Sequence, residues 1–272
     1  MIELVDSHCH LDQPHFDSDR EAVIARAAEN GVTKLINPGV DLPSSRAAVA
    51  LARQHPCIYA AVGVHPHDAR TLDAAALDEL KALARAHKNA AIGEIGLDYY
   101  WDSRKRDLQL RIFQSQLDLA EELSLPVVVH IRDKDGSSWR AMEDALAILG
   151  QWTAHLKSNA SATASAPGEL HSFSGDLASA ERAVSLGFML GICGPVTFKN
   201  AKTLRKLVQA LPLENLLTET DAPFLAPAPH RGRRNEPAYV CLIAEEIARL
   251  RENSTENVSM ETYANAKRLF HW

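Results

Sequence analysis

The chain has 272 residues, of which 46% are hydrophobic and 24% are charged. This composition supplies enough apolar material for a large core, and we expect no membrane span, because no apolar run approaches roughly 18 residues. The formal net charge of −6 excludes a protein that holds nucleic acid by its overall charge. A polyanionic substrate would need a local basic patch or bound cations.

The N-terminal residues turn polar at once, without a basic start or a long apolar segment, so we expect no signal peptide. The cysteines lie far apart and form no C-x-x-C pair; they are Cys9, Cys57, Cys193 and Cys241. This usage is typical of free thiols in a reducing compartment, and we expect a cytoplasmic protein.

Short apolar runs recur along the chain, and each is followed by a segment with helical periodicity. The predicted strands are 2–6, 34–40, 58–64, 90–95, 127–129, 169–172, 188–192 and 216–219. The predicted helices are 18–30, 44–54, 73–87, 105–123, 137–149, 177–186, 201–211, 237–251 and 255–270. Gly31 supplies the stop of the first helix.

Eight strands that alternate with helices over about 250 residues predict a (β/α)8 TIM barrel as a single domain, residues 1–272. A doubly wound sheet is the alternative, but it usually carries a glycine-rich turn after its first strand, where this chain has Asp6-Ser-His-Cys-His10. A Ser/Ala-rich stretch at about 156–168 is predicted to be a flexible loop.

Polar side chains follow the strands at the end that forms the mouth of a TIM barrel. The spacing of His8 and His10 points both imidazoles to one side of a strand, and Cys9 is expected to point away and pack. The other residues that we place on this rim are His65, Glu94, His130, His171 and Asp221. Divalent cations are the natural partners of so many buried imidazoles and carboxylates, and this donor set suits Zn²⁺, Mn²⁺, Ni²⁺, Fe²⁺ or Mg²⁺.

Several motifs make the sequence similar to a known family. They are Asp6-Ser-His-Cys-His-Leu-Asp12, Gly63-Val-His-Pro-His67, Gly93-Glu-Ile-Gly-Leu-Asp-Tyr99, Val128-Val-His130, His171-Ser-Phe-Ser-Gly175 and Glu219-Thr-Asp-Ala-Pro-Phe-Leu225. Together with 230–237 and 265–270, they resemble the TatD family of metal-dependent deoxyribonucleases, whose fold is a metallo-dependent hydrolase barrel. The long Ser/Ala-rich segment before His171 departs from the family pattern, and His155 upstream of it ranks below His171 as a ligand.

The resemblance implies two divalent ions per chain, with Mg²⁺ expected in function and Zn²⁺, Mn²⁺ or Ni²⁺ as alternatives. One ion would be bound by His8, His10, Glu94 and Asp221, and the other by Glu94, His130 and His171. Glu94 would bridge the ions, which would activate a water for attack on a phosphodiester, with Asp221 as general base. No lysine stands at the end of the fourth strand, unlike in amidohydrolase relatives that use a carboxylated lysine.

Substrate contacts are expected from loops around the mouth. A small basic collar would consist of Arg132, Lys134, Lys199, Lys202, Arg231, Arg233 and Arg234, unless these are ordinary solvated loop residues. His65 would contact the scissile phosphate or orient a metal ligand. Tyr99, with Tyr100 and Trp101, would stack a terminal base or pack the loop.

A narrow mouth with little basic surface favours chain ends, so the expected activity is that of a monomeric 3'-5' exonuclease on single-stranded DNA. Two alternatives stay open at this point. The same metal pair could serve an amidohydrolase-type lactonase, deaminase or amidase, because the fold alone does not choose the substrate. The chain could also be a non-catalytic, metal-stabilised binding protein.

Overall fold

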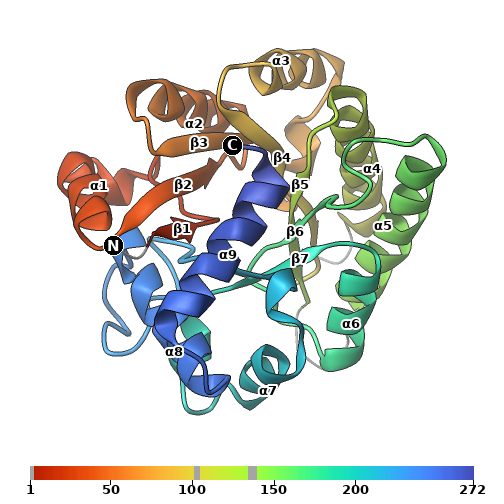
Figure 1. Ribbon diagram of the computed structural model, residues 1–272. Helices are drawn as coiled ribbons and strands as arrows, with labels where there is room; N and C mark the ends of the chain where they lie inside the picture. The colour runs from red at the N-terminus through yellow and green to blue at the C-terminus, as the bar shows by residue number, and fades with distance from the viewer. Residues whose placement is uncertain (1–2, 101–104, 134–139) are drawn as a thin grey trace.

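The computed structural model describes residues 3–100, 105–133 and 140–272. One sheet runs in the order β1 to β8, each strand parallel to the next (Figure 1). The strands are β1 (Leu4–Asp6), β2 (Val32–Pro38), β3 (Ile58–Val62), β4 (Asn89–Asp98), β5 (Val127–Arg132), β6 (Gly168–Leu170), β7 (Met189–Ile192) and β8 (Leu216–Thr218). The backbone N–H of Ser7 donates to the carbonyl of Thr218 at 3.0 Å, which brings β8 beside β1 and closes the barrel.

Helices surround the barrel (Figure 1). They are α1 (Arg20–Glu29), α2 (Leu42–Gln54), α3 (Ala74–Ala84), α4 (Arg106–Leu123), α5 (Arg140–Ser158), α6 (Leu177–Ser185), α7 (Lys202–Ala210), α8 (Val240–Leu250) and α9 (Thr255–Phe270). Asp41, Asp73 and Asp176 begin α2, α3 and α6, where each side chain accepts a backbone N–H of the first turn. None of the helices in the described ranges is long and apolar enough to cross a lipid bilayer. The TIM barrel predicted from the sequence is confirmed.

The core has two parts. A larger cluster joins the strands to the surrounding helices and includes Phe113 of α4 and Ile243 of α8. A smaller cluster joins strand residues such as Val128 to Leu269 and Phe270 of α9. The side-chain amide of Asn265 on α9 donates to the carbonyl of Leu216 at the start of β8. Thus α9 covers the amino end of the strands and leaves the carboxyl end open as the mouth.

Several element ends differ from the predictions. β4 was expected to end near residue 95, but it runs to Asp98 and has a register irregularity between Ile92 and Ile95, so Glu94 lies inside the strand. α5 was expected to end near residue 149, but it continues to Ser158, because Trp152 and Leu156 extend its buried face. The predicted start of this helix, at residue 137, lies outside the described residues.

The Ser/Ala-rich loop is therefore shorter than predicted, because its first residues belong to α5. Within it, Thr163 and Ala166 are buried. That the loop is flexible stays a prediction.

Candidate metal centre

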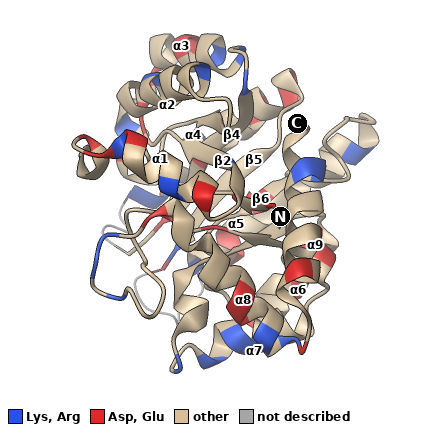
Figure 2. Cartoon of the chain, turned by 60° about the vertical axis from the view of Figure 1, so that its left-hand side comes forward, with Lys and Arg blue, Asp and Glu red and all other residues tan. Residues whose placement is uncertain are grey.

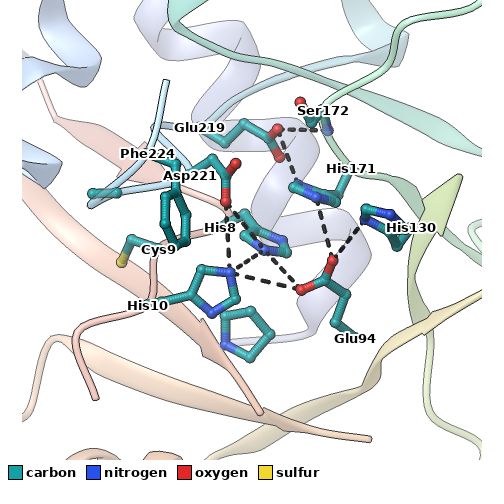
Figure 3. A network of polar contacts seen from close by, with 12 residues as sticks. His8, Cys9, His10, Glu94, His130, His171, Ser172, Glu219, Asp221 and Phe224 are labelled. Carbon is teal, nitrogen blue, oxygen red and sulfur yellow. Dashed lines mark hydrogen bonds and ion pairs between the residues drawn. The ribbon is translucent and has the colours of Figure 1, made fainter. Parts of the chain in front are cut away.

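The His-Cys-His segment directly after β1 brings two buried imidazoles together edge to face, with an angle of 77° between the ring planes. The Nε2 atoms of His8 and His10 lie 3.1 Å apart. The backbone fixes the segment, because the N–H of Cys9 donates to the carbonyl of Ile36 and that of His10 to the carbonyl of Ala222. The Cys9 thiol lies 3.6 Å from the Ile36 carbonyl and points away from the imidazoles (Figure 3), as expected for a packing residue.

Glu94 lies between two pairs of histidines (Figure 3). Its Oε2 atom is 3.5 Å from Nε2 of His8 and 3.6 Å from Nε2 of His10. Its Oε1 atom is 3.0 Å from Nδ1 of His130 and 3.4 Å from Nε2 of His171. The side chain is only 4% exposed, so each oxygen is held inside the protein towards a different pair. This is the geometry that a bridging carboxylate requires.

Asp221 joins the group from the segment after β8. Its Oδ1 atom is 3.5 Å from Nε2 of His10 and 3.9 Å from Nε2 of His8. Its φ of +57° lies in the left-handed region, which residues other than glycine seldom adopt. The N–H of Asp221 donates to the carbonyl of His8 at 2.8 Å, which helps to hold this conformation. Backbone strain that neighbouring bonds enforce is typical of functional sites.

Among the described residues, four groups of donor atoms could each hold a metal ion. They are His8, His10 and Glu94; His8, His171 and Asp221; His65, Glu94 and His130; and His65, His67 and Asp98, with the donor atoms of each group within 4.8 Å of one another. Buried nitrogen and oxygen atoms that all face one point are costly unless a cation or protons lie between them. The donor set therefore fits divalent metal ions, and all six predicted ligands meet here.

Burial and mutual contacts shift the pKa values of these residues. Burial and the neighbouring imidazole of His171 lower the pKa of His8 to about 4. Burial acts in the same direction on His10, but Asp221 and Glu94 outweigh it and raise the pKa to about 9. Burial also opposes ionisation of Glu94, yet the surrounding imidazoles hold its pKa well below the usual range. Glu94 is thus an ionised carboxylate, ready to bind a cation.

Two further carboxylates, which the sequence pattern does not single out, lie behind the histidines. Asp98 Oδ2 is 3.3 Å from Nε2 of His130, while Nδ1 of that ring faces Glu94. Glu219 Oε1 is 3.4 Å from Nδ1 of His171, while Nε2 of that ring faces Glu94. A carboxylate on the outer nitrogen of a ligating imidazole fixes its tautomer and orientation. Asp98 and Glu219 both lie in the family motifs, and this position is the sign in the sequence by which they could have been found.

Glu219 also belongs to a buried network below the centre. The N–H of Ser172 donates to Oε1 of Glu219 at 2.6 Å, and the hydroxyl of Ser7 donates to Oε1 of Glu169 at 2.7 Å. Burial raises the pKa of both glutamates well above the usual range. Gly191 on β7 leaves the space for this pair, because a Cβ there would overlap Oε2 of Glu219.

A cavity of about 660 Å³ opens over the centre. Its lining includes Glu94, His130, His171, Asp221 and His65. Nε2 of His65 is 3.7 Å from Oε1 of Glu94, and Nδ1 of His65 accepts the backbone N–H of His67 at 3.2 Å. His65 therefore stands at the wall of the cavity next to the candidate metal ligands.

The predicted substrate contacts are placed differently. Arg132 lines the cavity, with its guanidinium carbon 4.1 Å from the centre of the Tyr100 ring. Arg231 is exposed and lies 4.5 Å above the ring of Phe198. The structure does not bring Tyr99 to the mouth: the residue is 4% exposed and its hydroxyl donates to Asp144 at 2.8 Å. Tyr99 is therefore a packing residue, since a base has no access to its ring.

Three other residues from the sequence analysis lie apart from the centre or outside the described ranges. His155 is on α5, where it is exposed and 3.3 Å from Glu121. Trp101 and Lys134 lie outside the described residues.

A barrel whose strand ends carry imidazoles and carboxylates around one cavity defines the metallo-dependent hydrolase class of TIM barrels. Within this class the chain belongs to the TatD family, because the family model described as TatD related DNase matches residues 5–271. The chain is 40% identical over 267 residues to the uncharacterized metal-dependent hydrolase YabD of Bacillus subtilis, with 98% of each chain covered. It is thus a metal-dependent hydrolase, and the family resemblance seen in the motifs is confirmed.

Two other relatives cover the chain almost completely. It is 35% identical over 274 residues to the 3'-5' ssDNA/RNA exonuclease TatD of Erwinia tasmaniensis, with 98% of this chain and 100% of the relative covered. The crystal structure of YjjV, a TatD homologue of Escherichia coli, matches with a TM-score of 0.89 and 32% identity. That match covers 100% of this chain and 99% of YjjV.

Proposed function

We propose that this protein is a metal-dependent phosphodiesterase that shortens single-stranded DNA from its 3' end. The observation that carries the proposal is the position of Glu94, whose two oxygens face two separate pairs of imidazoles. His8, His10, Glu94 and Asp221 would hold one divalent ion, and Glu94, His130 and His171 would hold the other. The ions, Mg²⁺ in function with Zn²⁺, Mn²⁺ or Ni²⁺ as alternatives, would supply a nucleophile from water and neutralise charge on the phosphate.

Asp221 is the proposed general base and proton carrier. Its side chain is 14% exposed and lines the cavity, so it meets both the ligands and the substrate. Burial opposes its ionisation, but His10 and the neighbouring imidazoles keep its pKa below the usual range. An ionised carboxylate at the wall of the cavity can accept a proton at Oδ1 or Oδ2 and later pass it to the leaving oxygen.

The distribution of charge indicates the class of substrate. Figure 2 shows Lys and Arg mixed with Asp and Glu over the outer helices, in keeping with the net charge of −6. Arg132 lines the cavity, and the segments that follow β7 and β8 carry the exposed cations Lys199, Lys202 and Arg231. A small number of cations can neutralise only a small number of phosphates, so the site favours a chain end over a long duplex. The name of the Erwinia relative, a 3'-5' ssDNA/RNA exonuclease, supports the same substrate class.

We also propose that the enzyme works as a cytoplasmic monomer. All six metal ligands come from one chain, so the centre needs no second copy. Its four cysteines are unpaired, as expected for a reducing compartment.

The test uses protein stripped with a chelator and reloaded with Mg²⁺ or Mn²⁺, together with 5'-labelled single-stranded DNA. We expect a ladder that shortens nucleotide by nucleotide, no products with excess chelator, and at least a thousandfold loss in Glu94→Gln with the circular dichroism spectrum retained. Asp107→Asn, at a side chain that is 94% exposed on α4, is the matched control with normal activity.

Internal cuts would contradict exonuclease action. Faster metal-dependent cleavage of p-nitrophenyl acetate than of bis-p-nitrophenyl phosphate would favour the amidohydrolase-type alternative. DNA binding without cleavage, unchanged in Glu94→Gln, would favour a metal-stabilised binding protein.

A further inference from the structure

Two large apolar side chains are exposed side by side at the mouth. Among the described residues, the exposed large hydrophobic side chains are Leu177, Phe224, Leu225 and Met260, with exposed fractions of 41%, 46%, 40% and 61%. Phe224 and Leu225 are consecutive, and both line the cavity over the metal centre. Contiguous apolar surface at a functional cavity indicates a contact with a ligand, whereas single exposed apolar residues are ordinary.

The backbone of Phe224 is tied to the metal centre. Its N–H donates to the carbonyl of Asp221 at 2.8 Å, and its own carbonyl accepts the side-chain amide of the buried Asn235 at 2.6 Å. The ring meets His10 and His15 at steep angles of 67° and 74°, with centroid distances of 6.2 Å and 6.1 Å. Figure 3 shows Phe224 beside Asp221 and His10. The backbone that carries the ring is therefore fixed beside the candidate metal centre.

We propose that Phe224, with Leu225 beside it, is the platform on which a nucleobase next to the scissile phosphate stacks. This inference rests on the proposed nuclease function and names the part of the substrate that the site recognises. A phosphate held at the metal centre would lie next to His10, and the centre of the Phe224 ring is 6.2 Å from the centre of that imidazole, so the base of the same nucleotide would be within reach of the ring. Every base has a π face, so the platform accepts all four bases.

Stacking on Phe224 also accounts for a preference for single strands. Bases in a duplex are stacked on their neighbours and must first be unstacked, whereas a base at a single-stranded end is free to reach the ring. Phe224 thus takes the role that the sequence analysis considered for Tyr99.

The experiment compares three 5'-labelled oligothymidylates: the intact strand, one with an abasic terminal residue and one with an abasic penultimate residue. For the wild type we expect kcat/KM to fall on the order of tenfold when the base that stacks is missing. In Phe224→Ala and Phe224→Leu, kcat/KM on the intact strand should fall by a similar factor through a higher KM. The same variants should then cleave the intact and the abasic strands equally well. Phe224→Trp should restore discrimination, and Met260→Ala, on α9, is the matched control that behaves like the wild type.

The inference would be overturned if Phe224→Ala and Phe224→Leu preferred the intact strand over the abasic strands as strongly as the wild type does. A second measurement separates this result from failure of the nuclease proposal. An oligonucleotide with 2-aminopurine near its end is titrated with protein in chelator, where no cleavage takes place. Quenching by the wild type and Met260→Ala, but not by Phe224→Leu, supports the platform even if cleavage fails. Equal quenching by all three, or none by the wild type, refutes it.

Discussion

Asp98 Oδ2 lies 3.3 Å from Nε2 of His130, on the side of the imidazole opposite the nitrogen that faces Glu94. Asp98 is itself held in place, because its backbone N–H donates to the side-chain oxygen of Gln109 on α4 and its carbonyl accepts the amide of the same side chain. Burial opposes ionisation of Asp98, but His130 and His67 hold its pKa well below the usual range. The Asp98 carboxylate therefore orients the imidazole of His130 from outside the centre.

Asp98→Asn is expected to weaken metal binding about 10- to 100-fold, because the neutral amide no longer fixes the outer N–H of His130 with a negative charge. The affinity for Mn²⁺ or Zn²⁺ is measured by competition with a chromogenic chelator. The exposed Asp107→Asn is the control. Equal affinities in Asp98→Asn and the wild type would show that His130 does not need this partner.

Removal of the metal is expected to lower the melting temperature. Ions that bind only the folded protein stabilise it by about 2.7 kcal/mol at a concentration one hundred times their Kd. For a chain of this size, that corresponds to roughly 5–10 °C, measured by calorimetry with Mn²⁺ and with chelator. The shift should nearly vanish in Glu94→Gln, because Glu94 faces both pairs of imidazoles. An unchanged shift in this variant would place the stabilising ion elsewhere.

Acid stability should depend on Asp19, which lies just before α1. Both of its oxygens accept hydrogen bonds from the guanidinium of Arg234 at 2.7 Å. These bonds lower the pKa of Asp19 to about 2, because their effect is larger than the opposing effect of burial, which raises the pKa. A lowered pKa stabilises the fold above the unfolded value near 4, and this contribution is lost as the pH falls from about 4 to about 2.

We expect Asp19→Asn to lower the urea midpoint of unfolding at pH 7. The difference in midpoint between the variant and the wild type should become smaller below pH 4. Asp78→Asn, on the exposed side of α3, is the control for a surface carboxylate. A gap that stays constant with pH would mean that Asp19 acts through packing and not through its charge.

The strands and the convergence of the six candidate ligands could be predicted from the sequence because both depend on local pattern. A buried parallel strand is a short apolar run, and the polar residue that follows it marks the mouth of the barrel. Contacts between distant elements leave no such mark. Asp98 and His130 pair across the neighbouring strands β4 and β5, whereas Glu219 and His171 follow β8 and β6, which have β7 between them. Both contacts become visible only when the barrel is closed.

The choice between Tyr99 and Phe224 shows the same limit. Both are aromatic residues in motifs near metal ligands, and the sequence favours neither as the exposed ring. Tyr99 is turned into the protein because Asp144 on α5 accepts its hydroxyl, while the bond from the Phe224 N–H to Asp221 holds the other ring at the mouth. The register irregularity in β4 around Glu94 is likewise a tertiary feature, because the sequence 90–95 reads as a regular strand.

Gly191 and Gly150 provide a matched pair of glycine substitutions. A Cβ at Gly191 would overlap Oε2 of Glu219 and lie 2.7 Å from Oε1 of Glu169, and neither carboxylate has room to move in the buried network. Gly191→Ala should therefore destabilise the fold by about 1–3 kcal/mol, as other overpacked cores do.

At Gly150, inside α5, the nearest atoms are side-chain carbons of Leu186 at 3.9 and 4.0 Å, so Gly150→Ala should stabilise by about 0.5–1 kcal/mol. Urea unfolding of both variants gives the two free energies. Since Oε1 of Glu219 lies 3.4 Å from Nδ1 of His171, Gly191→Ala should also weaken Mn²⁺ binding, which Gly150→Ala should leave unchanged. Normal Mn²⁺ affinity in a destabilised Gly191→Ala would separate the buried glutamate pair from the metal centre and leave it a purely structural element of the barrel.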